Sequence, residues 1–150
     1  MDPRLISPHD LRLSAPEIFE AKATQTGAKR HVRWFVGYAP EPQEGTSSRV
    51  VFAAIHAFNE SGGAEVSCAS LISHPSDFDP TNEEFEQALR DSEALETLYD
   101  FLQPHVRSLL AMVNCGAKVP SKAPKPKFSR LKRASEDSEG EAVSDSHSTE

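Results

Sequence analysis

Histidine and cysteine are the residue types of this sequence best suited to metal or acid–base chemistry. A zinc site needs such ligands in pairs a few residues apart. The two cysteines are Cys68 and Cys115, and the six histidines are scattered at positions 9, 31, 56, 74, 105 and 147. The sequence has no GxSxG nucleophile motif, no phosphate-binding glycine loop and no CxxC pair. We therefore predict that the protein is not an enzyme and has no catalytic residue, metal or cofactor.

Two histidines and one acidic group remain as candidates, and each also has a structural explanation. His56 stands on a predicted strand, either as a lone acid/base group or as a histidine with satisfied hydrogen bonds at a sheet face. His105 follows Pro104 on a predicted helix, where it packs or contacts a neighbouring subunit. Four acidic residues lack the spacing of a calcium loop and fit the acidic start of a helix better: Asp77, Asp79, Glu83 and Glu84.

Charge divides the chain into three parts. Residues 1–116 carry 9 Lys/Arg against 17 Asp/Glu, residues 117–133 carry seven basic residues and no acid, and residues 134–150 carry six acids without Lys or Arg. An acidic folded part argues against nucleic acid as the main partner, because binding phosphates requires surface Lys and Arg. The basic run either binds an anionic partner or is solvated, and we expect a solvated arm.

The sequence also bears on where the protein works. The first ten residues lack the apolar core of a secretory signal. No apolar run approaches the roughly 20 residues of a membrane span. We expect a cytoplasmic protein with reduced thiols and no membrane insertion.

The elements that would position any site begin with strands. Residues 11–26 read as an edge strand interrupted at Pro16, where a missing N–H is tolerated. Residues 31–38, 49–58 and 64–72 alternate apolar and polar side chains, as strands do. The connecting loops are too short for crossover helices, so we predict a four-stranded antiparallel sheet.

Helices are predicted to follow the sheet. Thr81 and Glu84 form a capping box ahead of a short helix, whose apolar face carries Phe85, Ala88 and Leu89. A longer apolar stripe then runs through Leu95, Leu98, Leu102, Val106, Leu109, Leu110 and Val113. Pro104 predicts a kink or break in this helix, unless a new helix begins there. Strands followed by helices give an α+β arrangement, with the sheet on one side and the helices on the other.

Domain boundaries follow from these patterns. We expect a flexible N-terminus at 1–10, one α+β domain at 11–116, a Pro/Lys-rich basic arm at 117–133 and a disordered acidic tail at 134–150.

The strand at 31–38 carries large apolar side chains on both faces. Val32, Trp34 and Val36 share one face, whereas Phe35 lies on the other. Two helices would cover only one face of the sheet. The second face is therefore buried by a homo-oligomer or left as an exposed patch for binding.

The end of the long helix carries a recognisable motif. Pro104-His105-Val106-Arg107 is followed by an apolar helix to Gly116 and then by Val119-Pro120. This arrangement resembles the signature of the bacterial SecB chaperone family, which has a P-x-x-R element in its long helix, a glycine at the helix end and a proline at this distance from the arginine. Pro124, Pro126 and Phe128 resemble the arm that follows in the family.

Shorter matches support the same resemblance. Phe19-Glu20-Ala21 is similar to an F-E-A element at the end of the family's first strand. The remaining strands follow in the family's order and lengths, so the resemblance covers roughly residues 11–128.

The resemblance implies an ATP-independent holdase that binds unfolded polypeptide along apolar grooves, for protein export or antitoxin protection. It implies a client-binding groove at Val32, Trp34, Val36 and Tyr38, for which ordinary core is the alternative role. It also implies a homotetramer whose interface uses the long helix, unless that stripe packs on its own sheet: Leu98, Leu102, Val106, Leu109 and Val113. Glu17 and Glu20 form either an acidic patch for a basic partner or a solvated edge strand.

The chain departs from the family in two places. The apolar last helix of the family is missing, because the SRLKRASEDSEGE segment cannot pack. Ser67 and Ala69 stand where the export chaperones have the acidic or apolar residues of their contact region for the motor ATPase SecA. The resemblance therefore leaves SecA binding uncertain, and preproteins and antitoxins both remain as clients.

A competing hypothesis comes from a different class of protein. A small α+β domain can bind a ligand or act as an enzyme in a pocket between sheet and helix. Such a pocket needs polar groups that converge in an apolar cleft, and no such set is visible in the sequence.

Overall fold

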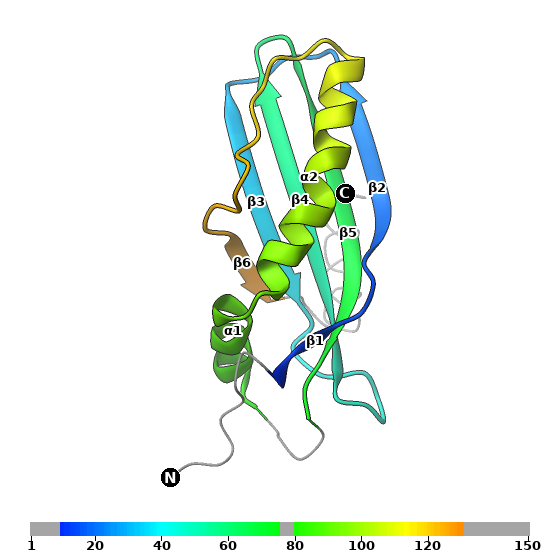
Figure 1. The fold of residues 1–150 in the computed structure, drawn as a ribbon, viewed down its shortest axis with the longest axis vertical. Helices are drawn as coiled ribbons and strands as arrows, with labels where there is room; N and C mark the ends of the chain where they lie inside the picture. Colours follow the sequence, from blue (N-terminus) through cyan, green and yellow to red (C-terminus); the bar gives the residue numbers. More distant parts are fainter. Residues whose placement is uncertain (1–9, 76–79, 131–150) are drawn as a thin grey trace, which may run out of the picture.

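The computed structural model describes residues 10–75 and 80–130, in which a sheet is covered on one face by helix (Figure 1). The predicted flexible N-terminus, apart from Asp10, and the predicted acidic tail lie outside the described residues. Six strands make up the sheet: β1 (Arg12–Leu13), β2 (Glu17–Thr24), β3 (His31–Tyr38), β4 (Ser48–Asn59), β5 (Gly62–Ser73) and β6 (Lys127–Arg130). Two helices follow β5: α1 (Asn82–Asp91) and α2 (Ala94–Met112).

The sheet is mixed rather than four-stranded and antiparallel, which corrects our prediction. Its order is β1–β5–β4–β3–β6, with β2 also paired to β5, and β6 runs parallel to β3 while the other pairs are antiparallel. The predicted strand at 11–26 divides at Pro16 into β1 and β2, since both segments pair with β5. The last strand, β6, lies within the predicted basic arm. The alternation of apolar and polar residues gave no sign of a strand there.

Consecutive strands β2 and β3 lie on opposite sides of the β4–β5 hairpin (Figure 1). Their connection, residues 25–30, crosses the hairpin turn, and Ala28 donates a backbone hydrogen bond to the Asn59 carbonyl at 2.9 Å. At Gly27 an added Cβ would collide with the backbone of Glu60. Glycine is therefore required where the connection crosses the turn.

Helix α1 begins as predicted. The Thr81 hydroxyl accepts from the Glu84 amide at 3.1 Å, and the Glu84 carboxylate accepts from the Thr81 amide at 2.8 Å. This capping box satisfies two donors that a helix start leaves open. The predicted apolar face is buried as well, at Phe85, Ala88 and Leu89.

Helix α2 runs through Pro104 without a break, so a break at this residue is ruled out. Pro104 is exposed, and buried leucines precede and follow it on the side of the sheet. Burial of each such side chain contributes about 1.5–3 kcal/mol, which together exceeds the roughly 3 kcal/mol cost of an interior proline. Beyond Met112, the left-handed residue is Asn114 (φ 53°) rather than Gly116. The Asn114 and Cys115 amides bond to the Ala111 and Leu110 carbonyls, as in a Schellman cap.

Alternation of the strands places the core between the sheet and α2. Every second residue of β4 is buried on the helix side, and β3 and β5 follow the same rule in register. The main core side chains from the strands are Trp34, Val36, Tyr38, Val51, Ile55, Val66, Cys68 and Ile72. Arg49 is also buried, and its guanidinium donates to Asn82 Oδ1 at 2.7 Å and to the Pro40 carbonyl at 3.0 Å. It thereby ties the start of α1 to the sheet.

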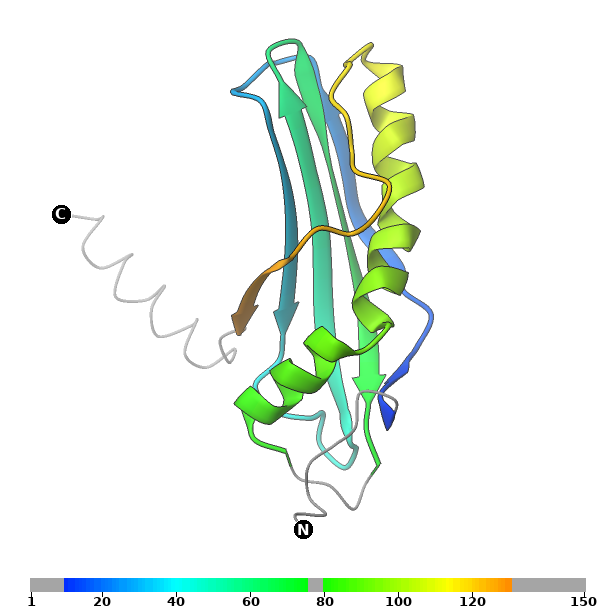
Figure 2. The same cartoon turned by 60° about the vertical axis from the view of Figure 1, so that its left-hand side comes forward.

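Residues 117–130, which we call the strap, correct a second expectation. We predicted a solvated arm over 117–133, but Val119 is only 7% exposed and residues 127–130 form β6. Figure 2 shows the strap passing from the end of α2 down to the edge of β3. Residues 131–133 lie outside the described chain.

The crossing at Gly27 yields a testable prediction. Gly27→Ala should lower the free energy of unfolding by about 1–3 kcal/mol, because the added methyl group forces the connection away from the hairpin turn. Gly116→Ala is the matched control, since no atom lies within 4 Å of its added Cβ. Urea unfolding of both variants measures the difference, and equal midpoints would contradict the close approach.

Candidate functional site

The structure places most of the predicted client groove in the core. Trp34, Val36 and Tyr38 are 3%, 0% and 2% exposed, whereas Val32 is half-buried. The Trp34 ring packs edge-on against Tyr99 of α2, with ring centroids 5.2 Å apart. The first three side chains are therefore covered, and their role in client binding stays a prediction that requires the cover to move.

Tyr38 lies at the lower end of this face and is polar only at its tip. Its hydroxyl donates to Glu86 Oε1 at 2.9 Å, and Glu86 in turn pairs with Arg90 at 2.8 Å. Burial, with the Glu86 hydrogen bond second, raises the pKa of Tyr38 to about 12. Tyr38 therefore remains protonated at neutral pH and links β3 to α1.

The apolar stripe of α2 largely packs on its own sheet. Leu98, Leu102 and Val106 are fully buried within the described chain, and Leu109 and Val113 are half-buried. The first three are explained by packing within one chain. The oligomer interface stays a prediction, for which Leu109 and Val113 retain accessible surface.

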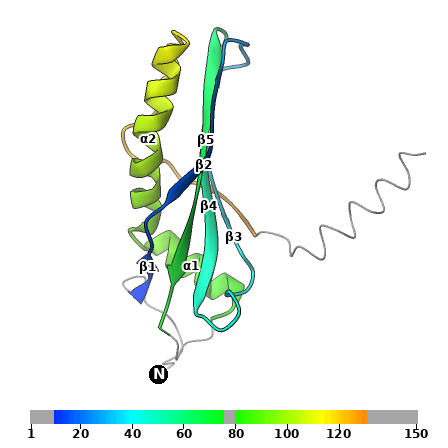
Figure 3. The same ribbon diagram turned by 90° about the vertical axis from the view of Figure 1, so that its right-hand side faces the viewer.

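Figure 3 shows α2 on one side of the sheet, and we call the opposite side the open face. The open face also carries apolar side chains. Phe19 is 59% exposed, and its ring meets Phe52 edge-on at 5.5 Å. Phe35 and Phe58 lie on the same face by strand register, among small side chains such as Ala54. The described helices leave this aromatic surface uncovered.

Sequence analysis identified Phe35 as apolar on the second face but missed Phe19. The β2–β5 pairing shifts register between Ile18 and Glu20, which is the mark of a β-bulge. Ile18 pairs with Cys68 on the helix side, while Phe19 turns onto the open face. The only signal in the sequence is the break in alternation at Ile18-Phe19.

The predicted acidic residues border the open face. Glu17 and Glu20 are exposed on β2 and pair in register with Ala69 and Ser67. Glu17 and Glu20 therefore lie beside Ala69 and Ser67, the two positions at which the sequence departs from the export chaperones. It adds no contact that would assign them a partner.

A row of polar side chains crosses the open face. In register, Lys22, Glu65, His56 and Arg33 lie on four adjacent strands. Glu65 contacts Lys22 Nζ at 3.1 Å and His56 Nδ1 at 3.5 Å. Burial lowers the pKa of His56, and the Glu65 charge opposes this shift. His56 is therefore a partnered histidine at a sheet face, the structural alternative of its two predicted roles.

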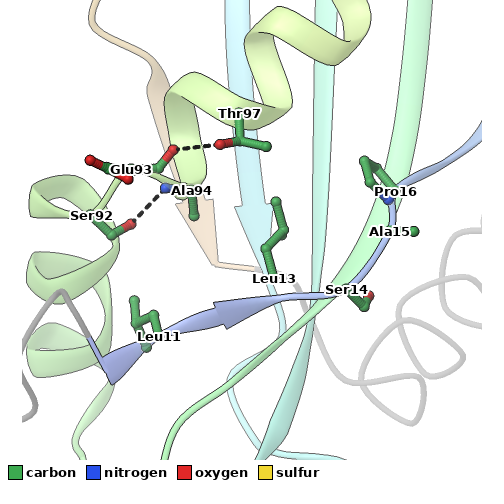
Figure 4. Close-up of a pocket in the computed structure, with 9 residues that line it drawn as sticks. All are labelled: Leu11, Leu13, Ser14, Ala15, Pro16, Ser92, Glu93, Ala94 and Thr97. Carbon is green, nitrogen blue, oxygen red and sulfur yellow. Dashed lines mark hydrogen bonds between the residues drawn. The ribbon is translucent and has the colours of Figure 1, made fainter.

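One cavity tests the competing ligand-binding hypothesis. It measures about 430 Å³ and lies between the β1–β2 segment and the start of α2 (Figure 4). Its three hydroxyl groups already form hydrogen bonds within the chain. Ser14 bonds to Ser70 at 3.1 Å, and Ser92 donates to the Leu89 carbonyl at 2.8 Å. Thr97 donates to the Glu93 carbonyl at 3.0 Å. Glu93 is the one charged residue of its lining, so the cavity lacks the convergent set of polar groups that a specific small-molecule site needs.

A second cavity, of about 420 Å³, adjoins the one accessible residue of the predicted groove. Val32 and Phe58 line it together with Arg30 and the start of the strap at Ala117 and Lys118. Its lining combines apolar side chains with two basic residues, Arg30 and Lys118.

Other features constrain the chemistry of the described chain. Within residues 10–75 and 80–130, no three His, Cys, Asp or Glu side chains gather closely enough to hold a metal ion. Both cysteines are free and buried, and burial raises the pKa of Cys68 to about 11. Neither described helix is long and apolar enough to cross a membrane.

Comparison with known proteins identifies the fold. No protein-family model matches the sequence, and no curated protein matches it. Among solved structures, the Mycobacterium tuberculosis Rv1957 SecB-like chaperone, in complex with a ChAD peptide from the Rv1956 HigA1 antitoxin, is similar to this chain. The match has a TM-score of 0.56 at 15% sequence identity and covers 77% of this chain and 89% of that chain. The chain therefore has a SecB-like fold, as the resemblance implied.

Burial of Trp34 gives a prediction for stability. Trp34→Ala should lower the free energy of unfolding by about 3–5 kcal/mol, because it removes a large side chain from the core. The neighbouring Arg33→Ala, at an exposed position, should stay within about 0.5 kcal/mol of wild type. Thermal unfolding of the two variants gives the comparison; a melt of Trp34→Ala like that of wild type would place this side chain outside the core.

The lowered pKa of His56 predicts a pH dependence. The unfolded chain binds this proton near the ordinary value of 6.5, and the folded protein binds it only at lower pH. Stability contributed by neutral His56 is therefore complete above pH 6.5 and is lost as pH falls. His56→Gln should flatten the drop in melting temperature between about pH 7.5 and 5, whereas His105→Gln on the exposed side of α2 should not. Parallel curves for wild type and His56→Gln would show that His56 is not the group responsible.

Proposed function

We propose that this protein is an ATP-independent chaperone of the SecB-like type, which holds extended segments of unfolded polypeptide on apolar surface. The observation that carries the proposal is an aromatic open face on a SecB-like fold. The structural neighbour of that fold was solved with an antitoxin peptide bound, which supports peptides as the ligand class for this chain.

The chemistry of the open face suits such a ligand. Phe19, Phe35, Phe52 and Phe58 offer ring surfaces on the three strands β2, β3 and β4. The polar row of the same face is partly engaged in its own contacts, Lys22 and His56 with Glu65. Unfolded chains present apolar segments of varied sequence, so broad apolar contact is more useful than a specific set of hydrogen bonds. A catalytic role would need a polar constellation, and neither cavity described above provides one.

The remaining predictions of partners form part of the proposal. We propose a cytoplasmic homotetramer, with the accessible parts of Leu109 and Val113 at an interface, and light scattering would measure its mass. Clients are preproteins for export or antitoxins. The antitoxin role receives the more direct support, because the structural neighbour holds an antitoxin peptide and Ser67 and Ala69 depart from the export chaperones.

A pair of substitutions tests the open face. The double variant Phe19→Ser and Phe35→Ser should bind a reduced, carboxymethylated unfolded protein about tenfold or more weakly, as loss of aromatic anchors does. Phe19 is 59% exposed, and Phe35 is half-buried, so the fold should survive. Fluorescence anisotropy of the labelled unfolded protein measures the affinity.

Met112→Ser is the matched control, since Met112 is 76% exposed on α2 rather than on the sheet. It should leave binding unchanged. If the double variant keeps full affinity, or if the control loses as much, the open face is not the client surface.

A further inference from the structure

The strap is held on α2 by bonds to its backbone alone. The Tyr99 hydroxyl and the Gln103 amide both donate to the Pro120 carbonyl, at 2.7 and 2.6 Å. Arg107 donates to the Val119 carbonyl at 3.2 Å. Every polypeptide carries such carbonyl groups, so these three side chains can hold an extended chain of any sequence.

The far end of the strap is held in the same general way. Strand β6 pairs parallel with β3 from Phe35 to Tyr38, which again uses backbone groups. Its one apolar side chain, Phe128, is half-buried beneath the guanidinium of Arg90, 4.2 Å from the ring centroid. An aromatic residue under a cation is a contact that many unfolded chains can supply.

The strap lies against the predicted client groove. Tyr99 connects the two, because its ring packs on Trp34 while its hydroxyl bonds to Pro120. Val119 and Phe128 pack on the core cluster that contains Trp34, Val36 and Tyr38. Within the described chain, the buried indole N–H of Trp34 has no acceptor. If the strap left, the β3 edge from Phe35 to Tyr38 and the part of the core that Val119 and Phe128 cover would become accessible.

The strap is also held by weak contacts along much of its length. Its pairing with β3 spans four residues and is parallel, the weaker of the two pairings. Pro120, Pro124 and Pro126 cannot donate backbone hydrogen bonds. Most of its remaining residues are exposed, including Lys118, Lys122, Lys125 and Lys127. Few of its contacts would resist replacement by another extended chain.

We propose that the strap is a built-in occupant of a second peptide site, formed by α2 and the β3 edge, and that an extended client segment displaces it. The fitting client has an apolar side chain in the place of Val119 and an aromatic one about nine residues later, in the place of Phe128. This inference rests on the proposed chaperone function and adds a site distinct from the open face.

Trp34, the only tryptophan, reports strap release without any client. The latch variant Tyr99→Phe with Gln103→Ala removes both donors to Pro120 and keeps the ring that packs on Trp34. Its tryptophan emission should shift to the red, and acrylamide should quench it more strongly than in wild type. Ser108→Ala, at an exposed position of α2, is the matched control and should behave as wild type.

The affinity for a free copy of the strap measures displacement. A labelled peptide with the sequence of residues 117–130 should bind Phe128→Ser about tenfold or more tightly than wild type, because this change weakens only the chain's own strap and leaves Tyr99 and Gln103 in place for the peptide. The latch variant lacks these two donors and should therefore bind the peptide no more tightly than wild type. Equal affinities for wild type and Phe128→Ser would overturn the proposal.

Competition separates this inference from the proposed function. A reduced, carboxymethylated unfolded protein should displace the labelled peptide from Phe128→Ser, even when Phe19 and Phe35 are also replaced by serine. Peptide binding without such competition would overturn client displacement and leave the open-face test unaffected. If unfolded protein binds neither site, the proposed function fails while the tryptophan signal still reports a detachable strap.

Discussion

The helices of this protein form one layer, whereas the strands have apolar side chains on both faces. Helix α2 covers the side that carries Trp34, Val36 and Tyr38, and its buried leucines pack against that side. The other side keeps a cluster of phenylalanines in contact with solvent. Because an exposed aromatic surface of this kind promotes association, the shortage of helical cover accounts for both the candidate function and the expectation of an oligomer.

The two proposed sites would recognise a partner in two different ways. The open face offers ring surfaces with little hydrogen bonding, whereas the seat of the strap offers donors directed at backbone carbonyls. The hydrogen bonds from Tyr99, Gln103 and Arg107 go to backbone carbonyls and not to side chains of the strap. Both types suit partners that share a backbone and general apolarity but no common sequence, which is what an unfolded chain presents.

Local patterns predicted the elements that depend on local physics. Strand β3 was predicted to the residue, and the capping box of Thr81 and Glu84 forms with both of its bonds. Errors arose where tertiary contacts decide: α2 is not broken at Pro104 because the sheet holds both halves of the helix, and Phe19 is redirected by a bulge that only pairing with β5 reveals. Strand β6 contains one apolar residue, so its alternation has no signal. Trp34 is covered by α2, whose Tyr99 ring packs on it, and the sequence left open whether the helix packs on this face.

Site-specific photo-crosslinking would test the central claim most directly. A benzophenone amino acid in place of Phe52, in the middle of the open face, should crosslink to a client protein in its unfolded form and not to the same protein when folded. The same group in place of Met112 on α2 should crosslink to neither form. Equal crosslinking to folded and unfolded client, or none from position 52, would contradict the account of this surface as a holder of unfolded polypeptide.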